Sequence, residues 1–131
     1  MKVGVTGAAG FIGSHVCERL LAGGYTVVGV DDMSYGSVEN LEAFAANPRF
    51  EFEVLDCTDR KALKEASAGC GAILHLAAKK IPRYESALST LEVNVAGSHA
   101  ACDVAIELDA DLVLASTSDV YGTAEPPFAE D

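Results

Sequence analysis

Hydrophobic residues occur in two kinds of segment along this chain. Short segments of about four to eight mostly apolar or alternating residues are typical of strands, and apolar residues three or four positions apart mark one face of a helix. The first kind predicts strands at Met1–Val5, Tyr25–Val30, Phe50–Leu55, Ala72–Ala77 and Leu112–Ala115. The second kind predicts helices from Gly10 to Gly23, over Val38–Ala46, over Asp59–Ala68 and from about Ala87 to Leu108.

The helical spacing also predicts which side chains face the core. In the first helix, one stripe and its flank are expected to be buried: Ile12, Val16 and Leu20, with Gly13, Cys17 and Leu21 beside them. In the long helix, the expected buried side consists of Leu88, Leu91, Val95, Cys102, Ala105 and Ile106. Glu51 and Glu53 alternate with apolar residues in the third strand, which is therefore expected near an edge of the sheet.

The order of the elements, in which strands alternate with helices, predicts an α/β fold. Parallel strands joined by right-handed crossovers form a doubly wound sheet of the Rossmann type, for which we expect the strand order 3-2-1-4-5. The chain has 131 residues and shows no linker or repeat, so we expect one domain over residues 1–131. Ligands of such sheets bind at the carboxyl ends of the strands, where the order reverses between strands 1 and 4.

A glycine-rich turn, Thr6-Gly7-Ala8-Ala9-Gly10-Phe11-Ile12-Gly13, joins the first strand to the first helix. Gly7 and Gly10 allow a tight turn and the close approach of a ligand's pyrophosphate, and Gly13 allows the helix to pack closely on the strand. The amide groups at the start of the helix then face an anion. The first glycine gap is two residues, whereas the usual dinucleotide fingerprint has one. The alternative is therefore an ordinary turn whose glycines serve packing alone.

An acidic residue follows the second predicted strand. Asp31 comes 18 residues after Gly13, close to the spacing of about 20 at which an acid meets the adenosine ribose of a dinucleotide. A carboxylate there accepts hydrogen bonds from both ribose hydroxyls and repels a 2′-phosphate. The sequence therefore favours NAD over NADP as the cofactor.

The charge of the chain narrows the possible partners. Twenty acidic and nine basic side chains give a formal net charge of −11, and the basic residues form no cluster beyond Lys79-Lys80 with Arg83. Nucleic acids and anionic membranes are therefore not expected as partners. No apolar run approaches the ~18 residues of a membrane span, and no leader pattern follows Met1, so we expect a cytoplasmic protein.

The cysteines and histidines show no metal-site pattern. Cys17, Cys57, Cys70 and Cys102 contain no Cys-x-x-Cys pair, and the three histidines share no ligand spacing. We expect small buried thiols in a reducing compartment and no metal site. His75, at the end of a buried strand, is more typical of a structural histidine with satisfied hydrogen bonds than of a catalytic acid or base.

Further motifs follow the strands in order along the chain. They are Asp31-Asp32-Met33-Ser34, Asp56-Cys57, His75-Leu76-Ala77-Ala78 with Lys80, Asn94-Val95-Ala96-Gly97, and Ser116-Thr117-Ser118-Asp119-Val120-Tyr121-Gly122. With the glycine-rich turn, they resemble the motifs of the NAD-dependent epimerase/dehydratase family, the extended short-chain dehydrogenases that act on nucleotide sugars. The resemblance covers the whole chain. It implies NAD as the cofactor and a nucleotide sugar as the substrate.

The resemblance implies a role for each motif. Asp56 would hold the adenine, the segment His75–Ala78 would form a wall of the cofactor site, and Lys80 would lie on the nicotinamide side. Asn94 resembles the family's structural asparagine. The residues implied in cofactor binding are Gly7, Gly10, Phe11, Ile12, Gly13, Asp31, Asp32, Asp56, Cys57, Leu76, Ala77, Ala78, Lys80, Asn94 and Ser116. Two structural alternatives remain: Asp56 could cap the following helix, and Lys80 could be a solvated loop charge.

The resemblance implies a catalytic hydroxyl at Thr117 and leaves the reaction type open. Family members use a tyrosine base in Tyr-x-x-x-Lys, and no tyrosine here is followed four residues later by a lysine. We therefore expect the N-terminal cofactor-binding portion of such an enzyme, catalytically incomplete as it stands. An epimerase is favoured over a decarboxylase, which Thr117-Ser118-Asp119 also resembles, and over a dehydratase, because Ser118 cannot act as that class's acid. A non-catalytic NAD-binding module is a further alternative.

The same resemblance predicts self-association. Without the family's later segments, part of the long helix near Leu91, Val95 and Cys102 and the outer edge of the fifth strand would lack neighbours. Exposed apolar surface and an open sheet edge favour contacts between chains. We therefore expect a homodimer or further self-association.

Overall fold

The computed structural model describes residues 1–79, 86–123, 127 and 128. Parallel strands form one sheet: β1 (Lys2–Thr6), β2 (Thr26–Asp31), β3 (Phe50–Val54), β4 (Cys70–His75) and β5 (Asp111–Leu114). The helices are α1 (Phe11–Ala22), α2 (Arg60–Ala66) and α3 (Ala87–Leu108), with short 3₁₀ helices η1 (Val38–Asn40) and η2 (Ser118–Tyr121). The strand order β3-β2-β1-β4-β5 confirms the predicted doubly wound topology.

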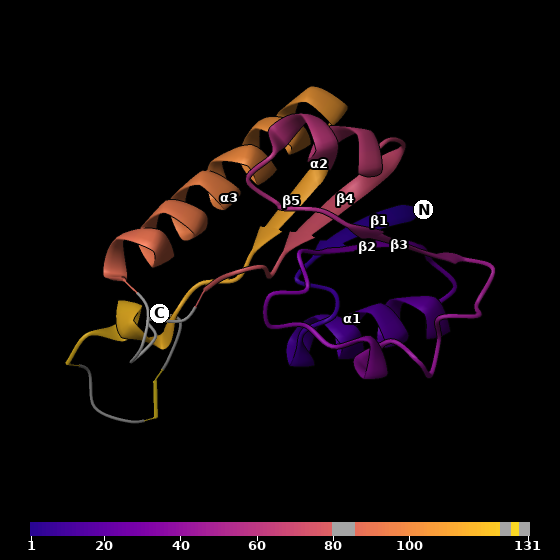
Figure 1. Ribbon diagram of the computed structural model, residues 1–131, viewed down its shortest axis with the longest axis horizontal. Coiled ribbons are helices and arrows are strands. Elements are labelled where there is room, and N and C mark those ends of the chain that lie inside the picture. Colours follow the sequence, from indigo (N-terminus) through magenta and orange to yellow (C-terminus); the bar gives the residue numbers. More distant parts are fainter. Residues whose placement is uncertain (80–85, 124–126, 129–131) are drawn as a thin grey trace.

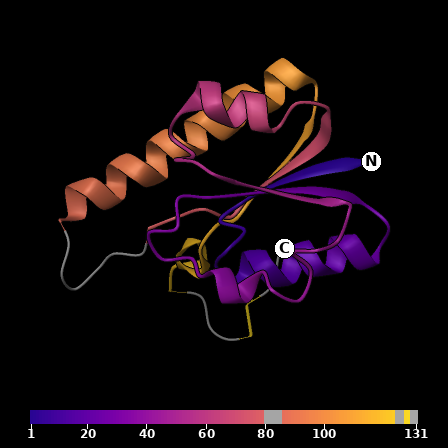
Figure 2. The same ribbon diagram turned by 45° about the vertical axis from the view of Figure 1, so that its right-hand side comes forward.

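Helices cover both faces of the sheet. Figure 1 shows α1 on one side and α2 with α3 on the other, and the turned view in Figure 2 shows the same three layers. Successive residues of a strand point to opposite faces, so the neighbours Val27 and Val28 of β2 belong to different halves of the core. Val27 packs in the half that contains Cys17 and Leu21 of α1, and Val28 packs in the half that contains Val104 of α3.

The long helix α3 packs on the sheet through small residues. Its buried residues are Thr90, Gly97, Ala100, Ala101, Val104 and Ala105. A Cβ atom at Gly97 would lie 3.0 Å from Cys57 Sγ, so the helix approaches too closely for large side chains. The prediction that Leu88, Leu91, Val95 and Ile106 face the core is therefore wrong, since all four are exposed. Ala105 is buried as predicted, and Cys102 is partly buried.

Close packing also decides which face of α1 is buried. Gly13, Ser14, Cys17 and Leu21 form its buried side, whereas Val16 and Leu20 are only partly buried. Ile12 is exposed, so its place in the predicted buried stripe is wrong. The cause is the contact of Gly13 with the glycine-rich turn, which fixes the rotation of the helix about its axis.

The segment predicted as a helix over Val38–Ala46 is the clearest difference in secondary structure. The structure has a 3₁₀ helix at Val38–Asn40, followed by turns up to residue 46. Hydrogen bonds three residues apart tighten this segment: Leu41 N donates to Val38 O at 2.9 Å, and Phe44 N donates to Leu41 O at 3.0 Å. The buried side chains of Leu41 and Phe44 hold these turns against the α1 side of the core. The bounds of the other predicted helices and strands agree with the structure within two residues.

The expectation of small buried thiols is confirmed for most of the cysteines. Cys17, Cys57 and Cys70 are buried, Cys102 is partly buried, and all of them are free thiols. Among the residues that the structure describes, no helix is both long and apolar enough to cross a membrane.

Candidate functional site

The glycine-rich turn lies at the carboxyl end of β1, in the centre of the sheet. Gly7 has a φ of +72°, which side chains rarely adopt, and a Cβ atom there would lie 2.8 Å from the amide nitrogen of Ala77. A Cβ atom at Gly13 would overlap the carbonyl oxygen of Gly7. The first and third glycines are therefore both required by close contacts within the turn and its surroundings.

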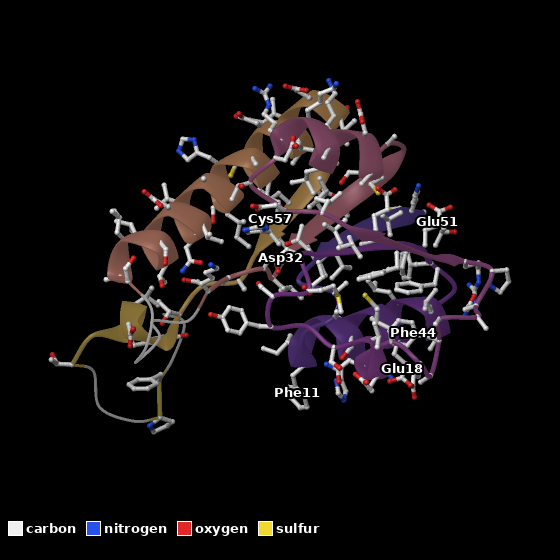
Figure 3. All side chains as sticks on the ribbon, viewed as in Figure 1. Phe11, Glu18, Asp32, Phe44, Glu51 and Cys57 are labelled. Carbon is white, nitrogen blue, oxygen red and sulfur yellow. The ribbon has the colours of Figure 1, made fainter. Side chains whose placement is uncertain are left out.

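The start of α1 is suited to bind an anion. Its N-cap, Gly10, provides no side-chain cap, and the first turn contains no acidic residue. The first amides of a helix have no acceptor within the helix, and the helix dipole gives this end partial positive charge. The side chains of Phe11 and Ile12 are exposed, and Figure 3 shows Phe11 projecting from the lower edge of the molecule, away from Asp32 and Cys57. A contribution of these two residues to ligand binding therefore comes from their backbone.

Asp31 connects the end of β2 to the glycine-rich turn. The residue is 8% exposed. Oδ2 accepts a hydrogen bond from Ala9 N at 3.0 Å, and Oδ1 accepts one from Met33 N at 2.9 Å. Each carboxylate oxygen has two acceptor positions, and the hydrogen bonds among the described residues use one on each, which leaves a second for a ligand hydroxyl. The same carboxylate can therefore hold the turn and bind a ribose.

These elements surround one pocket at the carboxyl ends of β1, β2, β3 and β4. Predicted cofactor residues that line it are Gly7, Gly10, Asp31, Asp32, Asp56, Cys57, Leu76, Ala77 and Ala78. Residues that the sequence analysis did not assign to the site also line it: Val30, Ser34, Tyr35, Gly36, Leu55, Lys79 and Val93. Of these residues, Gly36 could have been found from the sequence, because it is a glycine that follows Asp31 closely. A Cβ atom there would lie 2.8 Å from Asp31 Oδ1.

The segment that follows β4 forms one wall of the pocket and is fixed by α3. Asn94 Oδ1 accepts a hydrogen bond from Lys79 N at 2.8 Å, and Asn94 Nδ2 donates one to Lys79 O at 2.9 Å. Asn94 is absent from the described lining of the pocket, so its contribution is to hold this wall. The side chain satisfies both backbone groups of one residue, which gives an asparagine inside a helix a tertiary role.

The pocket carries several carboxylates around a buried thiol. Asp56 Oδ1 accepts a hydrogen bond from Thr58 N at 2.8 Å, while Asp59 caps α2 by accepting from Ala62 N at 3.0 Å. The alternative that Asp56 caps this helix is therefore wrong, and its exposed carboxylate is left at the pocket rim. Burial, and then the negative charges of Asp56, Asp32 and Asp31, raise the pKa of Cys57 to about 11. The thiol is neutral at physiological pH.

The remaining predicted residues lie apart from this pocket or outside the described residues. Thr117 and Ser116 are exposed after β5, and neither belongs to the described lining of the pocket. Thr117 Oγ1 accepts a hydrogen bond from Asp119 N at 3.2 Å and so caps η2. Lys80 lies outside the residues that the structure describes.

The sheet order, the glycine-rich turn and an acid at the end of β2 define a Rossmann-type dinucleotide-binding domain. The comparisons agree with this class and refine it. The chain belongs to the NAD-dependent epimerase/dehydratase family, whose sequence model matches residues 3–131.

Individual relatives carry out different reactions on nucleotide sugars. The chain is 37% identical over 124 residues to UDP-glucuronic acid decarboxylase 2 of Arabidopsis thaliana. The matched region covers 93% of this chain and 27% of the relative. It is similar in structure to UDP-glucose-4-epimerase of Stenotrophomonas maltophila with bound NAD (TM-score 0.87, 31% identity, 99% of this chain and 41% of the other). It is also similar to the dTDP-glucose 4,6-dehydratase DesIV of Streptomyces venezuelae with NAD bound (TM-score 0.85, 36% identity, covering 95% of this chain and 42% of the other). The chain thus spans less than half the length of these relatives.

Proposed function

We propose that this chain binds NAD in the pocket at the carboxyl ends of the strands, as the cofactor-binding portion of a nucleotide-sugar epimerase. One observation carries the proposal: the uncapped start of α1 and the carboxylate of Asp31 meet at one pocket, joined by the hydrogen bond from Ala9 N to Asp31 Oδ2. The first suits a pyrophosphate and the second suits a ribose diol, so the two subsites match the two halves of an adenosine diphosphate.

Each part of the pocket then has a defined task. The turn between Gly7 and Gly13 brings bare backbone close to the pyrophosphate, and Asp31 accepts from the ribose hydroxyls and repels a 2′-phosphate. Asp56 at the rim would accept a hydrogen bond from the adenine amino group. Leu76, Ala77 and Ala78 form the opposite wall. Bound NAD would supply the hydride acceptor and donor that epimerisation requires.

Thr117 would contribute a hydroxyl to a sugar oxygen at the edge of the site. General-base catalysis typically contributes about 10²–10⁴-fold, and no Tyr-x-x-x-Lys pair occurs in the sequence. We therefore expect NAD binding with negligible turnover of UDP-sugars by this chain. A nucleotide-sugar decarboxylase is the second candidate, because Thr117-Ser118-Asp119 resembles that class and a 37% identical relative is a UDP-glucuronic acid decarboxylase.

Calorimetric titration of the purified chain with NAD and with NADP tests the cofactor proposal. We expect saturable binding of NAD and much weaker binding of NADP, and no binding of either would refute it. Incubation with UDP-galactose or UDP-glucuronate, followed by NMR of the products, tests the expected lack of turnover. Clear turnover would contradict catalytic incompleteness, and the product would separate an epimerase from a decarboxylase. A downstream reading frame that encodes Tyr-x-x-x-Lys would exclude a non-catalytic module.

Self-association is also proposed, because α3 carries exposed apolar residues along one face. Leu88, Leu91 and Val95 are more than half exposed, and so is Val113 on the edge strand β5. Exposed apolar side chains on an unpaired helix face and on a sheet edge favour contacts between chains. Light scattering at high protein concentration is expected to show dimers or larger species, which the double variant Leu91→Lys/Val95→Lys reduces. A monodisperse wild-type monomer would contradict the proposal.

A further inference from the structure

The hydroxyl of Thr6 lies at the centre of a buried hydrogen-bond cluster behind the pocket wall. Thr6 is the last residue of β1 and is 1% exposed. Its Oγ1 lies 2.8 Å from His75 Nδ1, and it accepts hydrogen bonds from Leu76 N and Ala77 N, each at 3.2 Å. Leu76 and Ala77 line the pocket, whereas Thr6 and His75 are absent from its described lining.

The donors around Thr6 Oγ1 determine the direction of each hydrogen bond. A hydroxyl has one hydrogen to donate and two positions that accept. The two backbone amides can only donate, so they occupy both accepting positions of the hydroxyl. The single hydrogen of Thr6 must then be donated to His75 Nδ1. It follows that Nδ1 carries no hydrogen and that His75 is neutral, with its proton on Nε2.

We propose that Thr6 and His75 act together as positioning residues for the cofactor wall. By accepting the hydrogen of Thr6, His75 keeps both accepting positions of the hydroxyl available for the Leu76 and Ala77 amides, and these amides set the wall that the cofactor meets. The identity of the ligand rests on the function proposed above, whereas the arrangement of the wall does not. His75 thus influences the pocket without contacting the ligand.

Protonation of His75 would disturb this arrangement. An imidazolium carries hydrogen on both ring nitrogens and has no accepting position, so Nδ1 would compete with the amides as a third donor to Thr6. Leu76 N retains another acceptor, the backbone carbonyl of Thr6 at 3.2 Å. The Leu76 amide is therefore the one expected to leave Oγ1, and the wall would shift at this residue while Ala77 N keeps the hydroxyl as its acceptor. Burial lowers the pKa of His75 from 6.5, so the neutral form dominates at physiological pH.

The groups around His75 determine whether a pH effect on the pocket can be attributed to this histidine. α3 contributes Gly97, whose Cβ position would lie 3.4 Å from the imidazole and 3.0 Å from the thiol of Cys57, and β5 contributes its register partner Leu114. The Cys57 thiol, in the segment between β3 and α2, also lies close to Gly97, and it stays neutral because its pKa is raised to about 11. The negative charges of the pocket carboxylates Asp31, Asp32 and Asp56 act on Cys57, whereas the pKa of His75 is lowered by burial. A pH effect caused by these carboxylates would persist when His75 is replaced.

The first test needs no cofactor. Long-range ¹H–¹⁵N NMR spectra of the full chain should show His75 with hydrogen on Nε2 alone at neutral pH. Thr6→Val removes the hydroxyl at nearly constant shape and should accelerate hydrogen exchange of the Ala77 amide about tenfold, whereas Thr6→Ser should keep wild-type exchange. An imidazole with hydrogen on Nδ1, or unchanged Ala77 exchange in a folded Thr6→Val variant, would overturn the proposal.

The second test measures NAD affinity against pH. Wild-type affinity should fall as the pH drops below 6.5, the ordinary pKa of histidine. His75→Leu should weaken binding about three- to tenfold at pH 7.5 and abolish the pH dependence. His75→Asn, which offers an acceptor near the position of Nδ1, should restore affinity without restoring the pH dependence. An unaltered pH profile in both variants would overturn the proposal, and absence of NAD binding by wild type would refute the proposed function alone.

Discussion

Replacement of Asp31 by alanine tests whether one carboxylate both stabilises the glycine-rich turn and selects the cofactor. The variant leaves the amides of Ala9 and Met33 without the acceptors that they have at 3.0 Å and 2.9 Å. Ala9 is fully buried, so its amide bears the full penalty of an unpaired donor, about 1–3 kcal/mol. Met33 is partly exposed and can reach water, which reduces its cost to about 1 kcal/mol. The free energy of unfolding should therefore fall by roughly 2–4 kcal/mol.

Urea denaturation followed by circular dichroism measures this loss. With a slope of about 1–3 kcal/mol/M, the midpoint should fall by at least about 0.7 M while the slope itself stays unchanged. Asp32→Ala is the matched control, because Asp32 is exposed and its hydrogen bonds among the described residues come from Ser34 in the same loop. This control should change the midpoint far less. Equal midpoints for the two variants would refute the structural role of Asp31.

Cofactor binding by the same variant checks the second role. Asp31→Ala should lose NAD affinity, because the acceptor for the ribose hydroxyls is gone, and discrimination against NADP should narrow, because the repulsive charge is gone. Calorimetry with both cofactors in parallel gives the ratio. A variant that gained NADP affinity and kept full NAD affinity would show that Asp31 does not bind the ribose.

Further outcomes are expected from three other changes. Gly13→Ala should destabilise the fold by about 1–3 kcal/mol in thermal unfolding and abolish NAD binding, because its Cβ overlaps the glycine-rich turn, whereas a Cβ at Gly4 meets only ordinary contacts and Gly4→Ala should be mild. Asn94→Ala should weaken NAD binding about tenfold by calorimetry, because both hydrogen bonds to Lys79 are lost; unchanged affinity would contradict this. Alkylation of Cys57 by iodoacetamide should be slow at pH 8 and rise about tenfold per pH unit until its pKa of about 11, as measured by mass spectrometry; rapid modification at pH 7 would contradict the burial of this thiol.

The topology could be predicted because strands and helices differ in hydrophobic period over the whole chain. The orientation of α3 could not, because size outweighed hydrophobicity at its contact with the sheet. Gly97, Ala100 and Ala101 let the backbone approach closely, and larger residues such as Leu91 and Ile106 were left outside. A prediction that ranks residues by hydrophobicity alone therefore places the larger apolar residues of α3 in the core, although the structure buries the face with small residues.

The residues of the candidate site also fall into those that a sequence pattern indicates and those that it does not. Gly7, Gly10 and Asp31 are recognisable because local backbone geometry and strand endings leave a signature in neighbouring residues. Tyr35, Lys79 and Val93 belong to the loop after β2, the segment after β4 and helix α3, which meet only in three dimensions. The hydrogen bond between Thr6 and His75 joins residues 69 positions apart, so no local pattern indicates it.

The central strand β1 pairs with a neighbour close in sequence on one side and a distant one on the other. β1, α1 and β2 occupy residues 2–31, whereas β4 begins only at Cys70. Pairing β1 with β4 closes the longer loop. It is the slower step, because ordering a longer loop costs more conformational entropy. On a ribosome the N-terminal half therefore emerges with its glycine-rich turn and Asp31 before the segment after β4, which forms the opposite wall of the pocket, has been made. A cofactor that touches both halves can act only on the finished sheet, where it slows unfolding and cannot guide the first steps of folding.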